Sequence, residues 1–464
     1  MLWCASFNIS LNAAMASPVG ASCESNLLNQ ESQQVPQGYV VIVAGYSSGA
    51  DIAPALRARG VKNIIHVQPS ATKDTASLLL RSYDDSQYVR NIIFDGDYNA
   101  LLTELSGIPL AGIIAGTETG VALADRLNEQ YGLPGNGTQF SEAKRNKYLM
   151  HQQLKAAGVP SMRDILTSKL QEILDWIDSP EGNQGQWPVV VKPVDSAATE
   201  GVFICSNPQE VTQAFQSLLG RTTLLGTTIN QVLVQEYLDG TEFVVNTASL
   251  HGKNIIGEIW KYHKKKMRRP EGGLSNIYLF DELMEFVGPE SDILSAYAAK
   301  VLKALNIVNG PAHLEIMMTA RGPVLVEVGA RLMGGHTHIA TRQAVGVSPL
   351  DLSLKALLWP QEFEAIYKAG PLKRLMPVRH LELVSSVAGT VKAVNHIDTI
   401  RRLPSFWSPN GEGAHFPHVG EPIERTIDLL TSAGSLWLLG ASEDQISRDY
   451  ETIRRLETTM FEVE

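Results

Sequence analysis

The stretch from residue 313 to residue 336 constrains the fold most, because its pattern predicts a β-hairpin. Two apolar-rich arms flank a short turn, in which Gly322 is free to adopt a positive φ. The first arm alternates between apolar and polar side chains, and the second is rich in valine. A three-residue turn at 320–322 sets Thr319 opposite Pro323 and so predicts how the two strands pair.

This pairing predicts two carboxylates that face each other across the hairpin. Glu315 lies directly opposite Glu327, and period-two alternation places His313 and Arg331 on the same face. Opposed carboxylates repel each other, so they are either solvated or have a cation between them. An all-oxygen ligand set favours Mg²⁺ or Mn²⁺. We prefer the metal site to a solvated acidic face, because Arg331 and Gly334-Gly335-His336 follow at once.

Length and composition set broad limits. A chain of 464 residues is expected to form two to four domains. The net charge of -10 argues against a general nucleic-acid binder. Cys4, Cys23 and Cys205 lie far apart, without metal or disulfide spacing, so we expect a reducing cytoplasm. No apolar run is long enough to span a bilayer, and residues 1–37, without Lys or Arg, predict a poorly ordered extension.

A βαβ pattern follows that extension. Residues 39–44 predict a buried strand, residues 50–59 a helix and residues 61–67 a second strand, which is typical of a doubly wound sheet. The loop 45–49 lacks the GxGxxG spacing of a dinucleotide site, so we prefer a simple tight turn. The turn 116–120 opens another helix, which either receives a small anion such as a substrate carboxylate or begins at an ordinary turn.

Basic residues gather where a second helix is expected to begin. Ser141 is predicted to cap this helix, with Lys144, Arg145 and Lys147 in its first two turns. Cations at a helix N-terminus oppose the helix dipole. A nearby phosphate explains these residues about as well as simple solvation does.

A further lysine, Lys192, ends the buried strand predicted at 187–193 and needs a partner for its charge. The loop 195–201 that follows offers backbone N–H groups and hydroxyls, as a flexible flap over phosphates would. A helix at 208–219 and a strand at 232–237 complete a small β-α-β lid.

Three later segments carry weaker signals. A strand edge at Glu236 can read an adenine through its backbone, and Glu242, six residues further on, can hold ribose hydroxyls. The basic run 261–269, which includes His263, is either a mobile loop that covers the substrate or a solvated loop. From residue 373 the chain becomes rich in strands, and we expect packing or dimerisation there rather than chemistry.

Taken in order, VVVKPVDSAATEGV, VQEYLDGTEF and HLEIMMTARGPVLVEVGARLMGGH resemble the ATP-grasp superfamily, within its carboxylate–amine ligase branch. The resemblance covers residues 38–464. Within this branch the sequence is most similar to the bacterial L-amino acid ligases, which join two unprotected L-amino acids into a dipeptide. It implies an ATP-grasp fold of α/β and α+β domains: an N-terminal doubly wound α/β domain, a small lid domain and a C-terminal α+β domain. The implied limits are 1–37 (extension), 38–137 (N-terminal domain), 138–236 (lid), 237–372 (catalytic domain) and 373–464 (C-terminal subdomain).

The resemblance also implies roles for residues that match the family's motifs. The implied ATP contacts are Lys147, Lys192, Ser196, Thr199, Gly201, Glu236, Tyr237, Leu238 and Glu242. Glu315 and Glu327 match the Mg²⁺ ligands. Arg331, Lys192 and His336 would act in catalysis, and the implied substrate contacts are His263, Gly334, Gly335 and His336.

The implied reaction consumes ATP and forms an acyl phosphate, which an amine then attacks. One position departs from the family: the common Glu-x-Asn-x-Arg reads here Glu327-Val328-Gly329-Ala330-Arg331, so the Asn ligand is missing. Other classes stay open. A biotin-dependent carboxylase subunit shares the fold, a nicotinamide dehydrogenase rests only on the βαβ pattern, and a nucleotide-binding regulator without catalysis rests only on Gly329. The expected partners are amino acids and ATP, with a homodimer as the default assembly, while the amino-acid pair is not specified.

Overall fold

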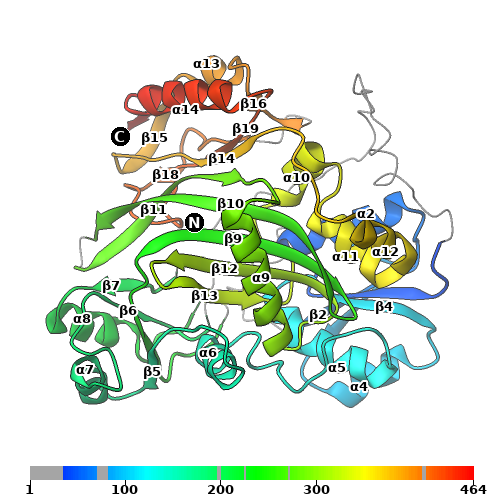
Figure 1. The fold of residues 1–464 in the computed structure, drawn as a ribbon. Coiled ribbons are helices and arrows are strands. Elements are labelled where there is room, and N and C mark those ends of the chain that lie inside the picture. The colour runs from blue at the N-terminus through cyan, green and yellow to red at the C-terminus, as the bar shows by residue number, and fades with distance from the viewer. Residues whose placement is uncertain (1–34, 70–81, 196–199, 224–225, 270–271, 410–413) are drawn as a thin grey trace.

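A computed structural model describes residues 35–69, 82–195, 200–223, 226–269, 272–409 and 414–464. Figure 1 shows the chain as three regions around one large curved sheet, with the N-terminal domain and the lid on opposite sides of its lower edge. Within these ranges no helix is long and apolar enough to cross a membrane.

The N-terminal region is a parallel four-stranded sheet in the order β3-β2-β1-β4. Its elements are β1 (Tyr39–Val43), α2 (Ile52–Ala58), β2 (Ile64–Pro69), β3 (Arg90–Phe94), α4 (Tyr98–Leu105), β4 (Leu110–Ala115) and α5 (Val121–Tyr131), with short 3-10 turns η1 (Ser47–Asp51), η3 (Asp85–Gln87) and η4 (Glu118–Gly120). Successive residues of β1 belong to different apolar clusters, so both faces of the sheet are covered, as expected for parallel strands. The predicted doubly wound pattern is therefore present.

The central sheet contains 13 strands within the described ranges. Its main path runs β13-β12-β9-β10-β11-β7-β6-β8-β5, and β14, β16, β17 and β19 extend it from β11. The strands are β5 (Asp164–Thr167), β6 (Val189–Lys192), β7 (Phe203–Cys205), β8 (Val232–Glu236), β9 (Gly240–Leu250), β10 (Lys253–Arg268), β11 (Leu274–Leu283), β12 (Gly310–Thr319), β13 (Gly322–Gly329), β14 (Val378–Glu382), β16 (Phe406–Trp407), β17 (Ala414–His415) and β19 (Ser435–Leu439). A small sheet of β15 (Gly389–Val394), β18 (Pro422–Ile423) and β20 (Phe461–Val463) lies in the C-terminal region.

Helices cover these sheets and bury their apolar faces. They are α6 (Lys147–Ala156), α7 (Leu170–Asp178), α8 (Pro208–Leu218), α9 (Pro289–Ala304), α10 (Thr337–Val345), α11 (Pro349–Leu358), α12 (Pro360–Ala369), α13 (Ile397–Arg401) and α14 (Glu443–Glu457). In Figure 1, α7 and α8 cover the lid strands, α9 crosses the central sheet and α14 covers the C-terminal strands. The lid has its own apolar cluster, built from α7, α8 and strands β6 to β8.

The hairpin of β12 and β13 differs from the predicted one near its turn. Thr319 pairs with Gly322 rather than with Pro323, so the loop has two residues instead of three. The Thr319 hydroxyl donates to the Gly322 carbonyl (2.8 Å), which tightens the turn. A β-bulge at Val326 then inserts one extra residue and restores the register. The predicted register at the turn is wrong, but Glu315 still pairs with Glu327 because the two one-residue shifts cancel.

Two other local predictions are corrected. Helix α6 begins at Lys147 after Asn146, whose side chain accepts from the two backbone N–H groups of the first turn, whereas Ser141 binds Asp125 instead. The basic run 261–269 is not a loop. Its residues 261–268 all lie in β10, where they pair with β11. Long cross-strand pairing orders this segment despite its charge.

Candidate active site

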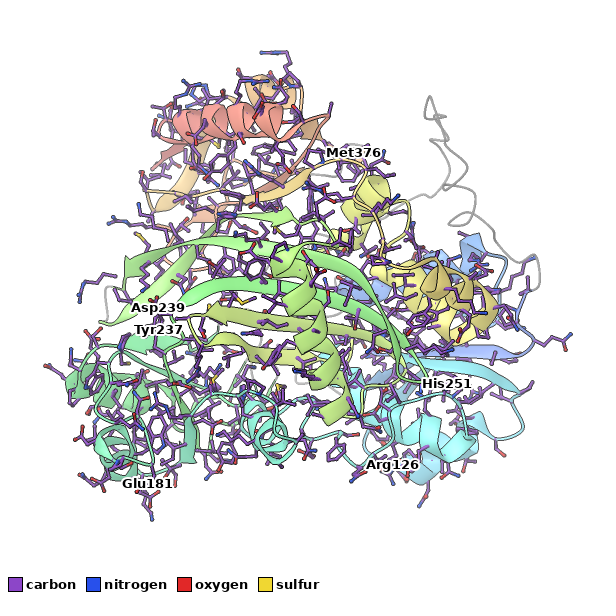
Figure 2. All side chains as sticks on the ribbon, in the orientation of Figure 1. Arg126, Glu181, Tyr237, Asp239, His251 and Met376 are labelled. Carbon is purple, nitrogen blue, oxygen red and sulfur yellow. The ribbon has the colours of Figure 1, made fainter. Side chains whose placement is uncertain are left out.

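A pocket of about 230 Å³ lies where the lid strands meet the hairpin of β12 and β13. It brings together predicted residues from four separate segments: Lys147, Lys192, Glu236, Tyr237, Leu238, Glu242, Glu315 and Glu327. Figure 2 places Tyr237 and Asp239 at the junction between the lid and the central sheet. Gly201 adopts a positive φ (+67°) close to Pro193, and the predicted flap residues Ser196 and Thr199 lie outside the described residues.

The acidic pair is held by regular strand pairing and partly neutralised by a lysine. Glu315 and Glu327 are cross-strand partners, and the Lys147 Nζ lies 2.8 Å from Glu327 Oε2. Burial acts to raise the pKa of Glu327, but Lys147, with smaller effects of Lys192 and Arg331, outweighs it and lowers the pKa to about 2. Glu327 is therefore a carboxylate at any ordinary pH. The α6 start at Lys147 matters here, because it directs this lysine toward the hairpin.

Lys192 is the second cation of the pocket and is 6 % exposed. It ends β6, where it pairs across the sheet with Leu233 of β8. Burial, and then repulsion from Lys147, lower the pKa of Lys192 to about 8. The neighbouring His151 is fully buried, and burial lowers its pKa to about 3, so it is neutral. Lys192 thus carries a proton that it holds weakly.

The predicted ribose contact, Glu242, is paired with a lysine that the sequence did not single out. Lys264 Nζ lies 2.8 Å from Glu242 Oε1 and 2.7 Å from the Tyr278 hydroxyl. Burial raises the pKa of Glu242, and Lys264 opposes that effect. Lys264 lies over the rings of Tyr262 and Tyr278, which are also part of the pocket wall. Period-two alternation of Tyr262, Lys264 and Lys266 within the basic run was the signal that could have found it.

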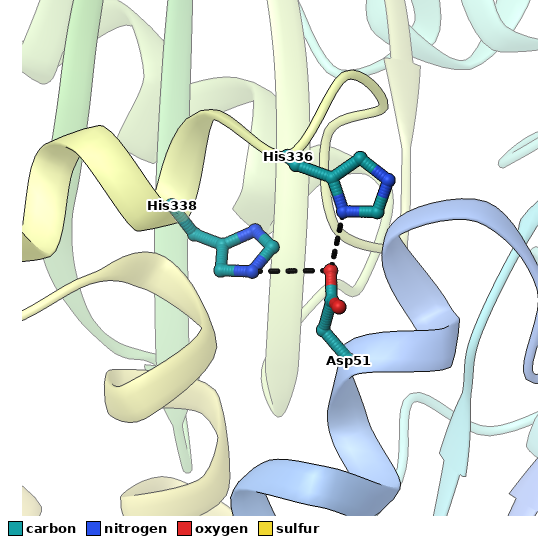
Figure 3. A group of neighbouring side chains, drawn as sticks. All are labelled: Asp51, His336 and His338. Carbon is teal, nitrogen blue, oxygen red and sulfur yellow. Dashed lines mark hydrogen bonds and ion pairs between the residues drawn. The ribbon is translucent and has the colours of Figure 1, made fainter. Parts of the chain in front are cut away.

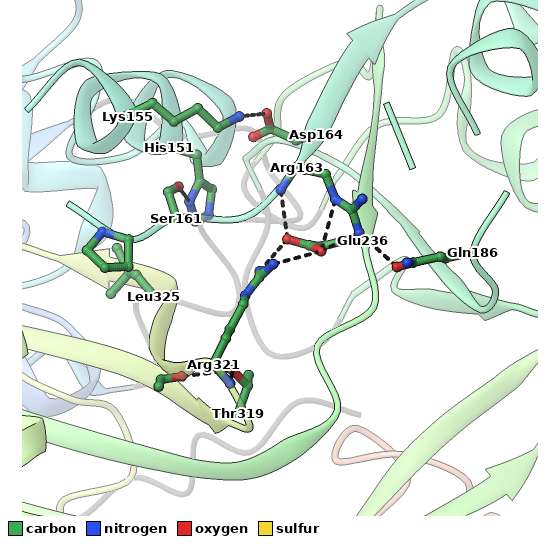
Figure 4. A network of polar contacts seen from close by, with 12 residues as sticks. His151, Lys155, Ser161, Arg163, Asp164, Gln186, Glu236, Thr319, Arg321 and Leu325 are labelled. Atoms are coloured by element: carbon green, nitrogen blue, oxygen red, sulfur yellow. Dashed lines mark hydrogen bonds and ion pairs between the residues drawn. The ribbon is translucent and has the colours of Figure 1, made fainter. Parts of the chain in front are cut away.

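The side chain of Glu236 is fully engaged by two arginines (Figure 4). Arg163 donates to it through Nη2 (2.8 Å) and Nε (3.1 Å), and Arg321 of the hairpin turn approaches from the other side. The Glu236 backbone N–H donates to the Arg163 carbonyl (3.0 Å). A contact of Glu236 with adenine therefore has to use its carbonyl, not its N–H.

Arg331 lies beside the pocket rather than in its wall. Its Nε is 3.1 Å from Glu118 Oε2, and its Nη1 donates to the Leu332 carbonyl at 3.0 Å. Glu118 belongs to η4, which follows β4 of the four-stranded parallel sheet, so this ion pair joins that region to the segment after β13. The predicted anion-binding turn at 116–120 thus carries a carboxylate directed at Arg331.

His336 points to an aspartate of the N-terminal domain, not to the pocket (Figure 3). Its Nδ1 is 2.5 Å from Asp51 Oδ2, and His338 Nε2 is 3.2 Å from the same oxygen. Burial raises the pKa of Asp51, but hydrogen bonds from both histidines outweigh it and lower the pKa strongly. The possible metal-ligand atoms of these three side chains lie within 4.8 Å of one another. The 2.5 Å separation is nevertheless that of a hydrogen bond, and it is shorter than the roughly 3.3 Å between neighbouring ligands of a tetrahedral zinc site.

The other predicted substrate residues have different outcomes. A Cβ added to Gly334 or Gly335 would meet no described atom within 4 Å, so space is available there. His263 does not reach the pocket: its ring stacks on Phe280 at 4.0 Å and its Nε2 lies 2.8 Å from Glu282. Its predicted role as a substrate contact therefore has no support in the geometry.

The C-terminal region contributes more than the sequence suggested. Asp428 and Leu429 line the pocket, and Asp428 Oδ2 lies 2.9 Å from Arg269 at the end of β10. The sequence led us to expect packing or dimerisation from this region, and the structure adds that it forms part of the pocket wall. No local pattern at Asp428 indicated a site, since the pocket residues other than Leu429 are more than a hundred positions away in the chain.

Similarity to known proteins identifies the family of this chain. The family model for the ATP-grasp domain matches residues 185–339. Dapdiamide A synthase of Enterobacter agglomerans is 32% identical over 429 residues, which cover 91% of this chain and 96% of that protein. The chain therefore belongs to the ATP-grasp family, in its carboxylate–amine ligase branch, and the predicted ATP-grasp fold is confirmed.

Two further proteins are similar to this chain. The L-arginine-specific L-amino acid ligase of Bacillus subtilis is 22% identical over 299 residues, or 60% of this chain and 68% of that one. The crystal structure of an L-amino acid ligase from Bacillus licheniformis superposes with a TM-score of 0.68 at 16% identity, over 93% of this chain and 100% of that chain. The protein is thus a ligase of the ATP-grasp type, related to amino acid ligases and to dapdiamide A synthase.

Proposed function

We propose that the protein joins the carboxylate of one L-amino acid to the amine of a second, through an acyl phosphate, and releases a dipeptide, ADP and phosphate. Similarity to the L-arginine-specific L-amino acid ligase of Bacillus subtilis supports amino acids as the substrate class. One observation carries the proposal most: two opposed carboxylates and two buried lysines converge on a single pocket at the junction of lid and hairpin.

The residues present fit a divalent cation. Glu315 and Glu327 supply only oxygen donors, and the lysine already beside Glu327 indicates that a positive charge is favourable there. We propose these two glutamates as the Mg²⁺ ligands. When bound, Mg²⁺ supplies Lewis-acid stabilisation of the charge on the transferring phosphoryl group.

We assign the nucleotide to the same pocket. Lys147 and Lys192 bind the phosphates. Backbone groups of Glu236 and Leu238 contact the adenine, and Glu242 holds the ribose. The ion pair of Glu242 with Lys264 fixes the carboxylate for that contact. Lys192, buried at the end of β6, is kept close to the phosphates by the rigid lid strands.

The chemistry follows from the poor leaving group of a free carboxylate. Transfer of the γ-phosphoryl group of ATP forms the acyl phosphate, in which the carbonyl carbon gains a phosphate leaving group. The incoming amine attacks that carbon, loses a proton and expels phosphate. The tetrahedral oxyanion needs a cationic donor, and Arg331, next to the acidic pair, is our candidate. We also propose that Gly334, Gly335 and His336 bind the amino-acid substrate. The hydrogen bond with Asp51 fixes the orientation of the His336 imidazole.

Domain limits of 38–137, 138–236, 237–372 and 373–464 are part of the same proposal. Separate apolar clusters in the lid and in the C-terminal region support these divisions. The largest cluster crosses the boundary between the N-terminal and catalytic domains, which favours a rigid contact there.

The experiment is a screen of the full chain with ATP, Mg²⁺ and pairs of L-amino acids. ADP and phosphate are measured enzymatically and dipeptides by mass spectrometry. We expect ADP, phosphate and dipeptide in equal amounts for at least one pair. Release of AMP and pyrophosphate would contradict the acyl-phosphate route.

A matched pair of variants tests the site itself. Glu327→Gln should reduce turnover at least a hundredfold, which corresponds to a loss of about 3 kcal/mol of transition-state stabilisation. Glu142→Gln removes an exposed carboxylate just before α6 and should leave turnover unchanged. Full activity in Glu327→Gln would contradict the proposal that Glu327 is a Mg²⁺ ligand.

A further inference from the structure

Gly329 stands where the ATP-grasp pattern has an asparagine, and the structure explains the exchange by what fills the space beside it. A Cβ built on Gly329 would lie 2.8 Å from Glu118 Oε2 and 3.2 Å from Arg331 Nε. Both distances are tighter than an ordinary contact, so a side chain at 329 would displace the Glu118–Arg331 ion pair. By standard bond lengths the amide oxygen of an asparagine lies roughly 2.4 Å from its Cβ. The Glu118 carboxylate oxygen thus lies about where the side-chain amide of an asparagine at position 329 would lie.

Glu118 reaches this place from the N-terminal domain. It lies in η4, directly after β4 and before α5. Its side chain is 20 % exposed and that of Arg331 is 19 % exposed, so the pair is largely shielded from water. The second oxygen of Glu118 faces Arg145 at 3.8 Å, and Arg145 in turn reaches Asp195, at the start of the predicted flap, at 3.4 Å.

Strand geometry puts Arg331 next to the acidic pair. Glu327, Val328 and Gly329 pair with β12 in unbroken register, so Glu327 and Gly329 share one face of β13. The guanidinium carbon of Arg331 lies 3.3 Å from the Cβ position of Gly329 on that face. Two residues along a strand span only about 7 Å. An unrestrained Arg331 can therefore swing onto Glu327 and compete with a bound cation.

We propose that Glu118 is a positioning residue: it holds the Arg331 guanidinium beside, but not on, the Glu315–Glu327 pair, and Gly329 is the residue that makes room for it. The proposal rests on the proposed function, because it takes the two glutamates as the cation ligands. The chain thereby lacks one side-chain ligand and has an arginine anchored from another domain. Arg331 stays available for the oxyanion, and both carboxylates stay available for the cation.

The test measures cation binding and does not need an amino-acid substrate. MnADP is titrated into the full chain by isothermal titration calorimetry, and ADP in EDTA serves as the metal-free reference. Glu118→Gln should raise the Kd of MnADP about tenfold and leave the Kd of ADP in EDTA unchanged. Gly329→Ala should do the same, because its methyl group displaces the movable end of Glu118 rather than the backbone. Glu142→Gln, which removes an exposed carboxylate, should match the wild type.

A suppressor variant separates positioning from direct contact with the cation. In Glu118→Gln/Arg331→Met the competing guanidinium is gone, so the Kd of MnADP should return to within about twofold of the wild type. An unchanged Kd in Glu118→Gln overturns the proposal. A double variant that stays as weak as Glu118→Gln also overturns it, because Glu118 would then act on the cation itself. If Glu327→Gln binds MnADP normally, it is the proposed metal site that fails.

Discussion

Lys192 gives the sharpest single prediction, because its charge is predicted to be lost within the working range of most assays. Burial and the nearby Lys147 lower its pKa to about 8, from an ordinary value of 10.5. The pKa of Lys147 is raised, because Glu327 and other carboxylates outweigh its burial. Between pH 7 and pH 9, Lys192 is therefore the lysine of this pair that titrates.

The direction and size of the expected change in ADP affinity with pH follow from proton linkage. A bound phosphate stabilises the charged lysine, so we take the pKa in the complex as close to the ordinary 10.5. The free protein then loses its proton before the complex does, and ADP affinity falls as the pH rises. Between pH 7 and pH 9 the expected fall is about tenfold, or about 1.4 kcal/mol. At pH 8, binding should take up roughly half a proton per ADP.

Calorimetric titration of ADP at pH 7, 8 and 9, in buffers that differ in ionisation enthalpy, measures both quantities. Lys192→Arg is the matched control, since an arginine keeps its charge throughout this range and should remove the pH dependence. A flat affinity profile in the wild type would refute the reasoning. An equally steep profile in Lys192→Arg would also refute it, because another group would then be responsible.

Three further predictions concern buried groups. Lys264→Met leaves the buried Glu242 carboxylate without its 2.8 Å partner, so urea denaturation should show a loss of about 3–5 kcal/mol, partly recovered by adding Glu242→Gln; equal stability of the single variant and the wild type would count against the pairing. Asp51 has a lowered pKa, so its contacts contribute fully to stability above its unfolded pKa of about 3.9. That contribution starts to fall below this pH and is lost only as the pH falls through the lowered pKa of the folded state. Asp51→Asn should therefore lose about 1–3 kcal/mol at pH 7, and thermal scans should show this gap narrowing as the pH falls below about 4. A gap as wide at pH 3 as at pH 7 argues against the contacts of Asp51 with the two histidines. Cys205 is buried with its pKa raised to about 12, so peptide mass spectrometry should find it alkylated by iodoacetamide only after unfolding, and rapid labelling of the native protein would contradict this.

The parts of the site that the sequence predicted are those with a local signal. Lys192 was found because a charge at the end of an apolar strand is unusual, and Glu315 and Glu327 because alternation on two adjacent strands places them on one face. The predicted register was nevertheless wrong at Thr319, and the acidic pair survived because the bulge at Val326 cancels the shorter turn. Bulges depend on tertiary contacts. Here the freed Leu325 N–H donates to the Tyr297 hydroxyl of α9 at 2.8 Å, which no hairpin pattern contains.

The parts that the sequence missed are pairings between distant segments. Lys264 meets Glu242 only because β9 and β10 align over most of their length. Asp428 reaches the pocket only because the C-terminal region folds back against the end of β10. In each case the residue type was visible in the sequence, while the partner that gives it a role was fixed by sheet topology. Local periodicity carries no information on that choice.

Gly329 shows how a departure from a family pattern can be informative before a structure is known. In the sequence alone, the missing Asn ligand was the only support for a nucleotide-binding regulator without catalysis. In three dimensions the glycine leaves room for the side chain of Glu118, which lies 211 positions earlier in the chain. Glu118 contacts Arg331, the arginine that the family pattern retains. A Cβ at position 329 would lie 2.8 Å from Glu118 Oε2, so the carboxylate fits there only when residue 329 is glycine, and it then holds Arg331 Nε at 3.1 Å. The proposal therefore predicts that the two features change together, so related chains with asparagine at this position should lack an acid in the turn that corresponds to η4.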